Sequence, residues 1–148
     1  MDGSDDMIKL YSQRILALAA AIPHAGRLSP PAATARRRSP LCGSAVTVDL
    51  RLDGGRIVDF AQEVRACALG QASAAVLGGV VLGLGRDEVA RGRAELHQML
   101  TAGGPVPGAP FNGYEVLLPA RDYRNRHASI LLALDATLAA CDEALAAA

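Results

Sequence analysis

The apolar positions of this chain change from a period of two to a helical period near residue 67. Residues 46–52 alternate between apolar and polar side chains, and the alternation resumes over 58–64 after the sequence Asp53-Gly54-Gly55. Alternation is typical of a strand with one buried face, and this glycine pair is typical of a tight turn. The pattern therefore predicts an antiparallel hairpin followed by a helix over about 67–82, where small side chains permit close approach to the sheet.

Three further helices are predicted from apolar side chains spaced three and four residues apart. The first covers about 4–21, the second about 87–100, and the last and longest 120–147. Residues 103–113 are rich in glycine and proline and are predicted to form a loop or a short edge element. Residues 114–117 are predicted to add either a short strand or a helical turn.

The segment between the first helix and the hairpin, residues 23–40, shows no periodicity and contains several prolines. We predict an extended connection here, with the triplet Arg36-Arg37-Arg38 as a solvated stretch in preference to a binding patch. The carboxylates on the polar positions of the hairpin are likewise predicted to face solvent. They are Asp49, Asp59 and Glu63.

The length and composition predict one domain that spans residues 1–148 and folds without disulfides or a structural metal. The formal net charge is zero, so no overall basic field favours nucleic acid or acidic membranes as partners. The acidic start lacks the features of a signal peptide, and the apolar run 76–84 is too short to cross a bilayer. We therefore expect a soluble, cytoplasmic protein whose cysteines are reduced thiols.

Cys67 is the first candidate for chemistry because it lies where the hairpin pattern gives way to the helix pattern. A thiol in the first turn of a helix faces free backbone N–H groups, which favour the thiolate and lower the pKa. Packing is the alternative, since unpaired cysteines are often buried beside small residues. Cys42 precedes the first strand of the hairpin, so the antiparallel geometry brings it to the same end of the sheet as Cys67. This proximity favours a functional pair of thiols.

His127 lies on or beside the apolar stripe of the last predicted helix. A histidine there is more often a hydrogen-bonded core residue than a ligand, but imidazole together with two thiolates suits zinc or iron. Cys141 lies about 21 Å further along the same helix at 1.5 Å per residue, so it cannot share a metal with His127 and is assigned to packing or to the surface. His24 and His97 are predicted to be exposed.

Four segments of the chain resemble the U-type iron-sulfur cluster assembly scaffolds, the IscU/SufU/NifU N-terminal family. Residues 10–26 are similar to the family's first helix and the turn after it, and Ser39-Pro40-Leu41-Cys42-Gly43-Ser44 is similar to its Asn-Pro-x-Cys-Gly-Asp motif. Residues 65–74, which contain Cys67, resemble its Gly-Cys-x-x-x-x-Ala-Ser motif, and residues 118–131 resemble the helix that carries the third ligand. The long interval after Cys67 is closest to a divergent SufU/NifU-like branch.

The resemblance implies an α+β fold of SufE/NifU-like type, in which helices cover a small antiparallel β-sheet of about three strands and the C-terminal helix is long. It also implies a site of three cysteines and one aspartate that holds zinc or a nascent [2Fe-2S] cluster and exchanges sulfur with a cysteine desulfurase. This sequence departs from the family at two of those positions, because Ser44 replaces the aspartate and the third cysteine is absent. Either His127 occupies the position of that cysteine, which we prefer, or Ala128 does.

We therefore expect a scaffold or carrier for iron-sulfur cluster assembly, more than a catalyst, that binds zinc or a [2Fe-2S] cluster. Cys42, Cys67 and His127 are the expected metal ligands, Ser44 is a weak member of the cofactor site, and either cysteine is a candidate persulfide acceptor. The expected partners are a cysteine desulfurase and other iron-sulfur assembly proteins. Two alternatives remain open: a metal-free interaction protein of the same fold, and a zinc-dependent persulfide (sulfurtransferase) subunit.

Overall fold

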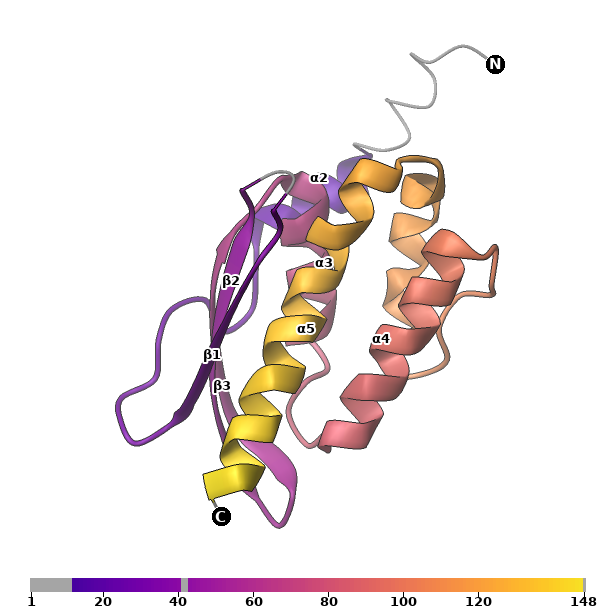
Figure 1. Cartoon of the computed structure of the whole chain (residues 1–148). Coiled ribbons are helices and arrows are strands. Elements are labelled where there is room, and N and C mark those ends of the chain that lie inside the picture. The colour runs from indigo at the N-terminus through magenta and orange to yellow at the C-terminus, as the bar shows by residue number, and fades with distance from the viewer. Residues whose placement is uncertain (1–11, 41–42, 148) are drawn as a thin grey trace.

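The fold combines one small antiparallel sheet with helices packed on it, as the α+β expectation requires. The structure is a computed structural model that describes residues 12–40 and 43–147. The sheet has the strand order β1 (Ala33–Arg38), β2 (Ala45–Asp53), β3 (Arg56–Arg65). The helical elements are α2 (Gln13–Ala20), α3 (Ala68–Gly78), α4 (Arg86–Thr101), the 3-10 segment η1 (Phe111–Asp122) and the long α5 (Arg124–Ala147). Figure 1 shows α3, α4 and α5 on one side of the sheet.

The β2–β3 hairpin forms where the alternation predicts it. Gly54 and Gly55 turn the chain with φ angles of 58° and 79°, which glycine adopts without strain. At the other end of the hairpin Ala45 pairs with Arg65, so the residues before β2 and after β3 lie together there. The register passes from Arg51–Asp59 to Leu52–Ile57, so Val58 on β3 is an extra residue that interrupts the predicted alternation and is exposed.

The prediction of a connection without secondary structure over 23–40 is wrong at its end, where β1 completes the sheet as an edge strand. Within β1 only Ala33 and Ala35 are half-buried, and the other residues are exposed. Such a strand has no large apolar side chain to mark its period, which explains why the pattern misses it. Residues 114–117 lie in η1, so the helical alternative for them is confirmed.

The predicted helix boundaries need three corrections. The N-cap of α2 is Ser12, whose backbone is extended (φ −60°, ψ 162°) and whose hydroxyl accepts a hydrogen bond from Ile15 N, so a single helix over 4–21 is wrong at Ser12. The residues up to 11 lie outside those that the structure describes. The helix after Cys67 ends at Gly78, and α5 begins at Arg124 because η1 occupies the preceding residues.

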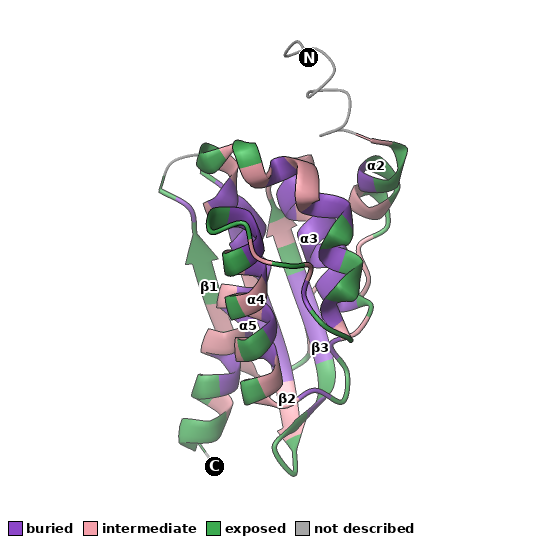
Figure 2. Cartoon of the chain, turned by 90° about the vertical axis from the view of Figure 1, so that its right-hand side faces the viewer, coloured by how far each residue is buried: buried purple, intermediate pink, exposed green. Residues whose placement is uncertain are grey.

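The core lies between the inner face of the sheet and α5, which contacts β1, β2, α3 and α4. Val46, Val48 and Leu50 on β2 are buried, as is most of α3 (Figure 2). Burial of this apolar surface provides the main driving force for folding. None of the helices in the described part of the chain is long and apolar enough to span a bilayer.

Candidate functional site

Cys67 is the N-cap of α3, with an extended backbone (φ −66°, ψ 170°) and a half-buried side chain. Burial raises the pKa of its thiol, but hydrogen bonds from the N–H of Gly70, the Ser129 hydroxyl, the N–H of Leu69 and the Arg126 side chain outweigh burial. The pKa of Cys67 is therefore lower than that of an ordinary cysteine, as the start of a helix predicts. The protein thus presents a thiol that favours the nucleophilic thiolate.

Two buried hydroxyl groups extend from this thiol toward β2. Cys67 Sγ lies 3.7 Å from Ser129 Oγ, and Ser129 Oγ lies 3.1 Å from Ser44 Oγ, within hydrogen-bond distance. Ser129 belongs to α5 and Ser44 immediately precedes β2, so three distant segments meet at this point. The structure therefore brings together two of the predicted site residues, Cys67 and Ser44, through a third that the sequence did not single out.

The contact between α3 and α5 at Ser129 requires a glycine at position 70. A Cβ atom on Gly70 would lie 2.6 Å from Ser129 Oγ and 2.7 Å from the Cβ of Ala66. Both distances are shorter than real Cβ contacts, so any larger side chain would push α5 away from the start of α3. Gly70 thereby sets the distance between the Cys67 thiol and the Ser129 hydroxyl.

His127 is buried, with 8% of its surface exposed, and its ring is held by η1. Nε2 lies 2.9 Å from the carbonyl oxygen of Ala120 and 3.1 Å from that of Arg121. Two carbonyl acceptors require that this nitrogen carries a proton and donates, so Nε2 cannot bind a metal in this arrangement. Among the described residues no hydrogen bond joins His127 to Cys67, and His127 instead lines a cleft of about 860 Å³ with Thr101 and Arg124.

Cys42 lies outside the residues that the structure describes. A hydrogen bond of 2.8 Å from Ser39 N to Ser44 O joins the segments before and after residues 41–42. Within residues 12–40 and 43–147, no three side chains of histidine, cysteine, aspartate or glutamate converge to hold a metal ion. The described residues alone thus supply one activated thiol and two hydroxyl groups, and a complete metal site needs a further ligand.

Among the described residues, no hydrogen bond or ion pair joins the remaining candidates to this thiol, and each has a different environment. Cys141 is fully buried in the core, and burial raises its pKa to about 11, which confirms its assignment to packing. His24 is exposed, as predicted, and its ring contacts Phe60 edge-on at 6.1 Å between centroids. His97 is half-buried, because it lies on a helix that packs against α5.

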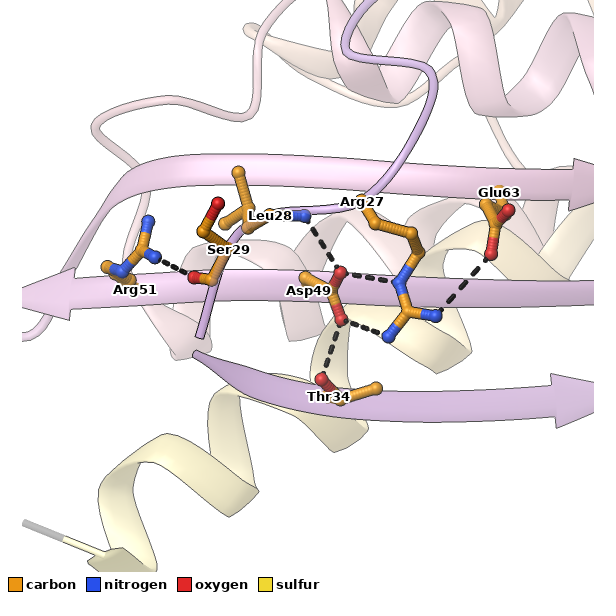
Figure 3. A network of polar contacts seen from close by, with 7 residues as sticks. All are labelled: Arg27, Leu28, Ser29, Thr34, Asp49, Arg51 and Glu63. Atoms are coloured by element: carbon orange, nitrogen blue, oxygen red, sulfur yellow. Dashed lines mark hydrogen bonds and ion pairs between the residues drawn. The ribbon is translucent and has the colours of Figure 1, made fainter. Parts of the chain in front are cut away.

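A second polar cluster surrounds Asp49, and here the prediction of a solvent-facing carboxylate is wrong. Asp49 is only 1% exposed, and its oxygens accept hydrogen bonds from Arg27 Nε at 2.6 Å, Arg27 Nη2 at 3.1 Å, Leu28 N at 3.0 Å and Thr34 Oγ1 at 2.6 Å (Figure 3). The Arg27 hydrogen bond, helped by Thr34 and Leu28, outweighs burial and lowers the pKa of Asp49 to about 2. This carboxylate is a fully bonded structural anion.

The reason for this burial is the path of residues 24–31 across the outer face of the sheet. The segment first pairs with the edge of β3, where Gly26 N donates to Gln62 O and Gln62 N donates to His24 O, both at 2.9 Å. It then passes over Asp49 and reaches β1, held by hydrogen bonds from Arg51 to the carbonyl oxygens of Ser29 and Pro31. Sequence alternation describes only the hairpin and carries no signal for a segment that covers it.

Comparisons with known proteins agree with this geometry. Residues 10–110 match the family model of the NifU-like N-terminal domain. The structure superposes with a TM-score of 0.92 on that of a nitrogen-fixing NifU-like protein (N-terminal) from Brucella abortus, which is 40% identical in sequence; the alignment covers 97% of this chain and 99% of that chain.

A second solved structure shows the same fold at lower sequence identity. It is a SufU protein from the thermophile Fervidobacterium islandicum, described as a candidate scaffold for iron-sulfur cluster assembly in the SUF system, with a TM-score of 0.76 and 22% identity over 87% of this chain and 94% of that chain. None of the curated proteins compared with the chain matches it. The family model and the 40% identical relative together show that this protein belongs to the NifU N-terminal domain family.

Proposed function

We propose that this protein is a scaffold or carrier in iron-sulfur cluster assembly, with Cys67 as its principal reactive group. The observation that carries the proposal is the activated, half-buried thiol at the start of α3, which the fold places beside Ser44 and Ser129. Membership of the NifU-like family, in which related proteins are assigned to iron-sulfur cluster assembly, supports it. The cargo would be a nascent [2Fe-2S] cluster or a zinc ion.

Cys42 is the proposed second ligand. It precedes Ser44 by two residues, and two residues of chain span at most about 7 Å, so it lies within reach of the segment that Ser129 connects to Cys67. His127 is the proposed third ligand and would have to bind through Nδ1, because the Nε2 proton is held by two carbonyl groups. Ser44 is a weak ligand compared with a carboxylate.

Metal and sulfide analysis of purified protein, before and after anaerobic reconstitution with ferrous iron and sulfide, tests this proposal. We expect the wild-type protein to retain metal, Cys67→Ala and Cys42→Ala to lose most of it, and His127→Gln, which keeps a donor for the Ala120 carbonyl, to lose part. Cys141→Ala is the matched control, because it removes a thiol that is buried in the core and away from the site. Equal metal content in the wild type and in a Cys42→Ala/Cys67→Ala double variant would disprove the scaffold proposal.

A second candidate function is acceptance of sulfur from a cysteine desulfurase. The lowered pKa of Cys67 favours it, as does the lack of a third metal ligand among the described residues. The Cys67 thiolate would attack the outer sulfur of the donor's cysteine persulfide. A new S–S bond forms on Cys67 while the donor's S–S bond breaks and its cysteine leaves as a thiolate, so no external oxidant is needed. Mass spectrometry after incubation with desulfurase and cysteine should show one added sulfur on Cys67, which Cys67→Ala abolishes and Cys141→Ala leaves intact.

The two alternatives to a scaffold differ in these same assays. A zinc-dependent sulfurtransferase subunit would carry zinc and form the persulfide without assembling a cluster. A metal-free interaction protein would bind its partner fully in the Cys42→Ala/Cys67→Ala double variant and would retain no metal in the wild type.

A further inference from the structure

The arginine triplet of the sequence has no part in the site described above, and the sheet gives it a definite placement. Opposite residues of an antiparallel pair share a face, and the register aligns Arg36 with Thr47 and Glu63, and Arg38 with Ala45 and Arg65. This face is the one that carries Asp49, because Thr34 on β1 bonds to that carboxylate. Arg36, Arg38 and Arg65 therefore lie on the outer face, away from α5. We call these three residues the basic sheet surface.

Neighbouring carboxylates neutralise the charges of the basic sheet surface only in part. Glu63 lies in the row of Arg36 and Asp49 in the next row, and Arg27 contacts both carboxylates, at 3.6 Å and 2.6 Å. With Arg27, the four arginines and two carboxylates leave a net positive charge on this face. In the described part of the chain, no ion pair involves Arg36, Arg38 or Arg65, and all three are exposed. A chain with zero formal net charge thus concentrates positive charge at one end of its sheet.

That end is also the one that carries the reactive thiol. Arg65 is the last residue of β3 and precedes Cys67 by two positions, while Arg38 is the last residue of β1 and pairs with the first residue of β2, next to Ser44. Arg126 on α5 adds a further cation, which hydrogen-bonds to Cys67. A partner that reaches Cys67 from the sheet side therefore approaches over a surface with net positive charge.

We propose that the basic sheet surface docks an acidic protein surface, namely that of the sulfur donor which delivers its persulfide to Cys67. The inference rests on the proposed function, because it assigns the surface to the partner of that thiol. Charge complementarity favours this partner: exposed charges next to a reaction site steer association and orient the encounter, and they contribute more to the association rate than to the final affinity. Arginine suits the role, since its planar guanidinium binds carboxylates through paired hydrogen bonds.

The test compares two triple variants that remove the same charge. Arg36→Gln/Arg38→Gln/Arg65→Gln neutralises the basic sheet surface, whereas Arg14→Gln/Arg56→Gln/Arg91→Gln neutralises exposed arginines elsewhere on the chain. The readout is the rate at which a cysteine desulfurase from the same organism adds sulfur to Cys67, measured at subsaturating protein between low and high salt. We expect the first variant to be roughly tenfold slower at low salt and equal to wild type at high salt, and the second to stay near the wild-type rate.

The other possible results distinguish the docking surface from sulfur acceptance. Equal rates and equal salt dependence for wild type and both variants, with persulfide formed in each, would overturn the docking surface and leave the proposed function standing. Absence of persulfide on wild-type Cys67 would instead contradict sulfur acceptance itself. In that case the docking surface would still be supported if wild-type protein bound the same desulfurase in a salt-dependent way and only the first variant lost this binding. Tighter binding of a DNA duplex than of the desulfurase, lost in the first variant, would assign the surface to nucleic acid and overturn the proposal.

Discussion

Asp49 on β2 and Cys67 at the start of α3 are two ionisable groups that the fold treats in opposite ways. Asp49 receives four hydrogen bonds from Arg27, Leu28 and Thr34, and its side chain is closed to solvent. Cys67 is half-buried, and its Sγ lies 3.7 Å from Ser129 Oγ. The Asp49 carboxylate is closed to solvent and serves stability, whereas the partly exposed Cys67 thiol remains able to react.

Removal of the Asp49 carboxylate is expected to have the largest effect, a loss of stability. Asp49→Ala would leave the Leu28 N–H, the Thr34 hydroxyl and the Arg27 guanidinium without their acceptor, and we expect a loss of about 3 kcal/mol in the free energy of unfolding. Urea denaturation measures it, with Asp59→Ala as the control, because Asp59 lies on the same hairpin but is exposed. The control should change stability by less than about 0.5 kcal/mol. A similar small change for both variants would show that the Asp49 cluster is not structural.

The same carboxylate predicts how stability depends on pH. The pKa of Asp49 in the folded protein is about 2, below the ordinary value of 3.8 for an aspartate. A lowered pKa contributes stability that is present above the unfolded value and is lost as pH falls through the folded value, so we expect a loss of about 2 kcal/mol between roughly pH 5 and pH 2. The difference between wild type and Asp49→Asn, measured by urea denaturation across this range, should shrink as pH falls. A constant difference would contradict the assignment.

Gly70→Ala tests the packing of α3 against α5 next to the Cys67 thiol. The new methyl group would meet Ser129 Oγ and Ala66 Cβ at less than 3 Å, so we expect α5 to shift and the protein to lose on the order of 2 kcal/mol. Gly79→Ala is the matched control near the end of the same helix, where a Cβ would make ordinary contacts at 3.6 and 3.7 Å. Thermal unfolding should therefore separate the two variants clearly. Equal melting temperatures would show that the α3–α5 contact tolerates a methyl group.

The smallest effect concerns the reactivity of the thiol. Ser129→Ala removes a hydroxyl group that favours the thiolate, so the pKa of Cys67 should rise and its alkylation by iodoacetamide near neutral pH should slow. A factor on the order of three is expected, since one hydrogen bond contributes about 0.5–1.5 kcal/mol. Thr137→Ala is the control, because this α5 hydroxyl bonds to the Ala133 carbonyl in its own helix. An unchanged rate in Ser129→Ala would remove Ser129 from the site.

The features that the sequence predicted well depend on neighbours along the chain. The alternation over 46–64 is set by one buried face, and the N–H groups of Gly70 and Leu69 at the start of α3 contribute to the lowered pKa of Cys67. These contributions are local consequences of backbone geometry, whereas the hydrogen bonds from Ser129 and Arg126 come from α5. The apolar pattern also predicted the long final helix, and the family resemblance added an α+β fold of about three strands covered by helices; both are confirmed.

The features that the sequence missed depend on segments that meet only in the folded protein. Asp49 occupies a polar position of an alternating strand, and its burial follows from residues 24–31, which cross the strand from elsewhere in the chain. Ser129 is inconspicuous in the sequence, and its role follows from the close approach that Gly70 permits. The engagement of His127 Nε2 with η1 carbonyls likewise requires the 3-10 segment to pack beside α5. Long-range packing of this kind leaves no periodic signal.

The hairpin has one further consequence, for how this protein can change over evolution. The pairing of Ala45 with Arg65 anchors the thiol end of the sheet, while the Gly54-Gly55 turn lies at the other end of both strands. Lengthening a loop costs only about 0.6 kcal/mol for each doubling of its length. Insertions at the turn can therefore extend the protein, or add a new contact surface, without moving Cys67 relative to Ser44 and Ser129. The geometry of the site therefore does not depend on the length of the loop at the tip of the hairpin.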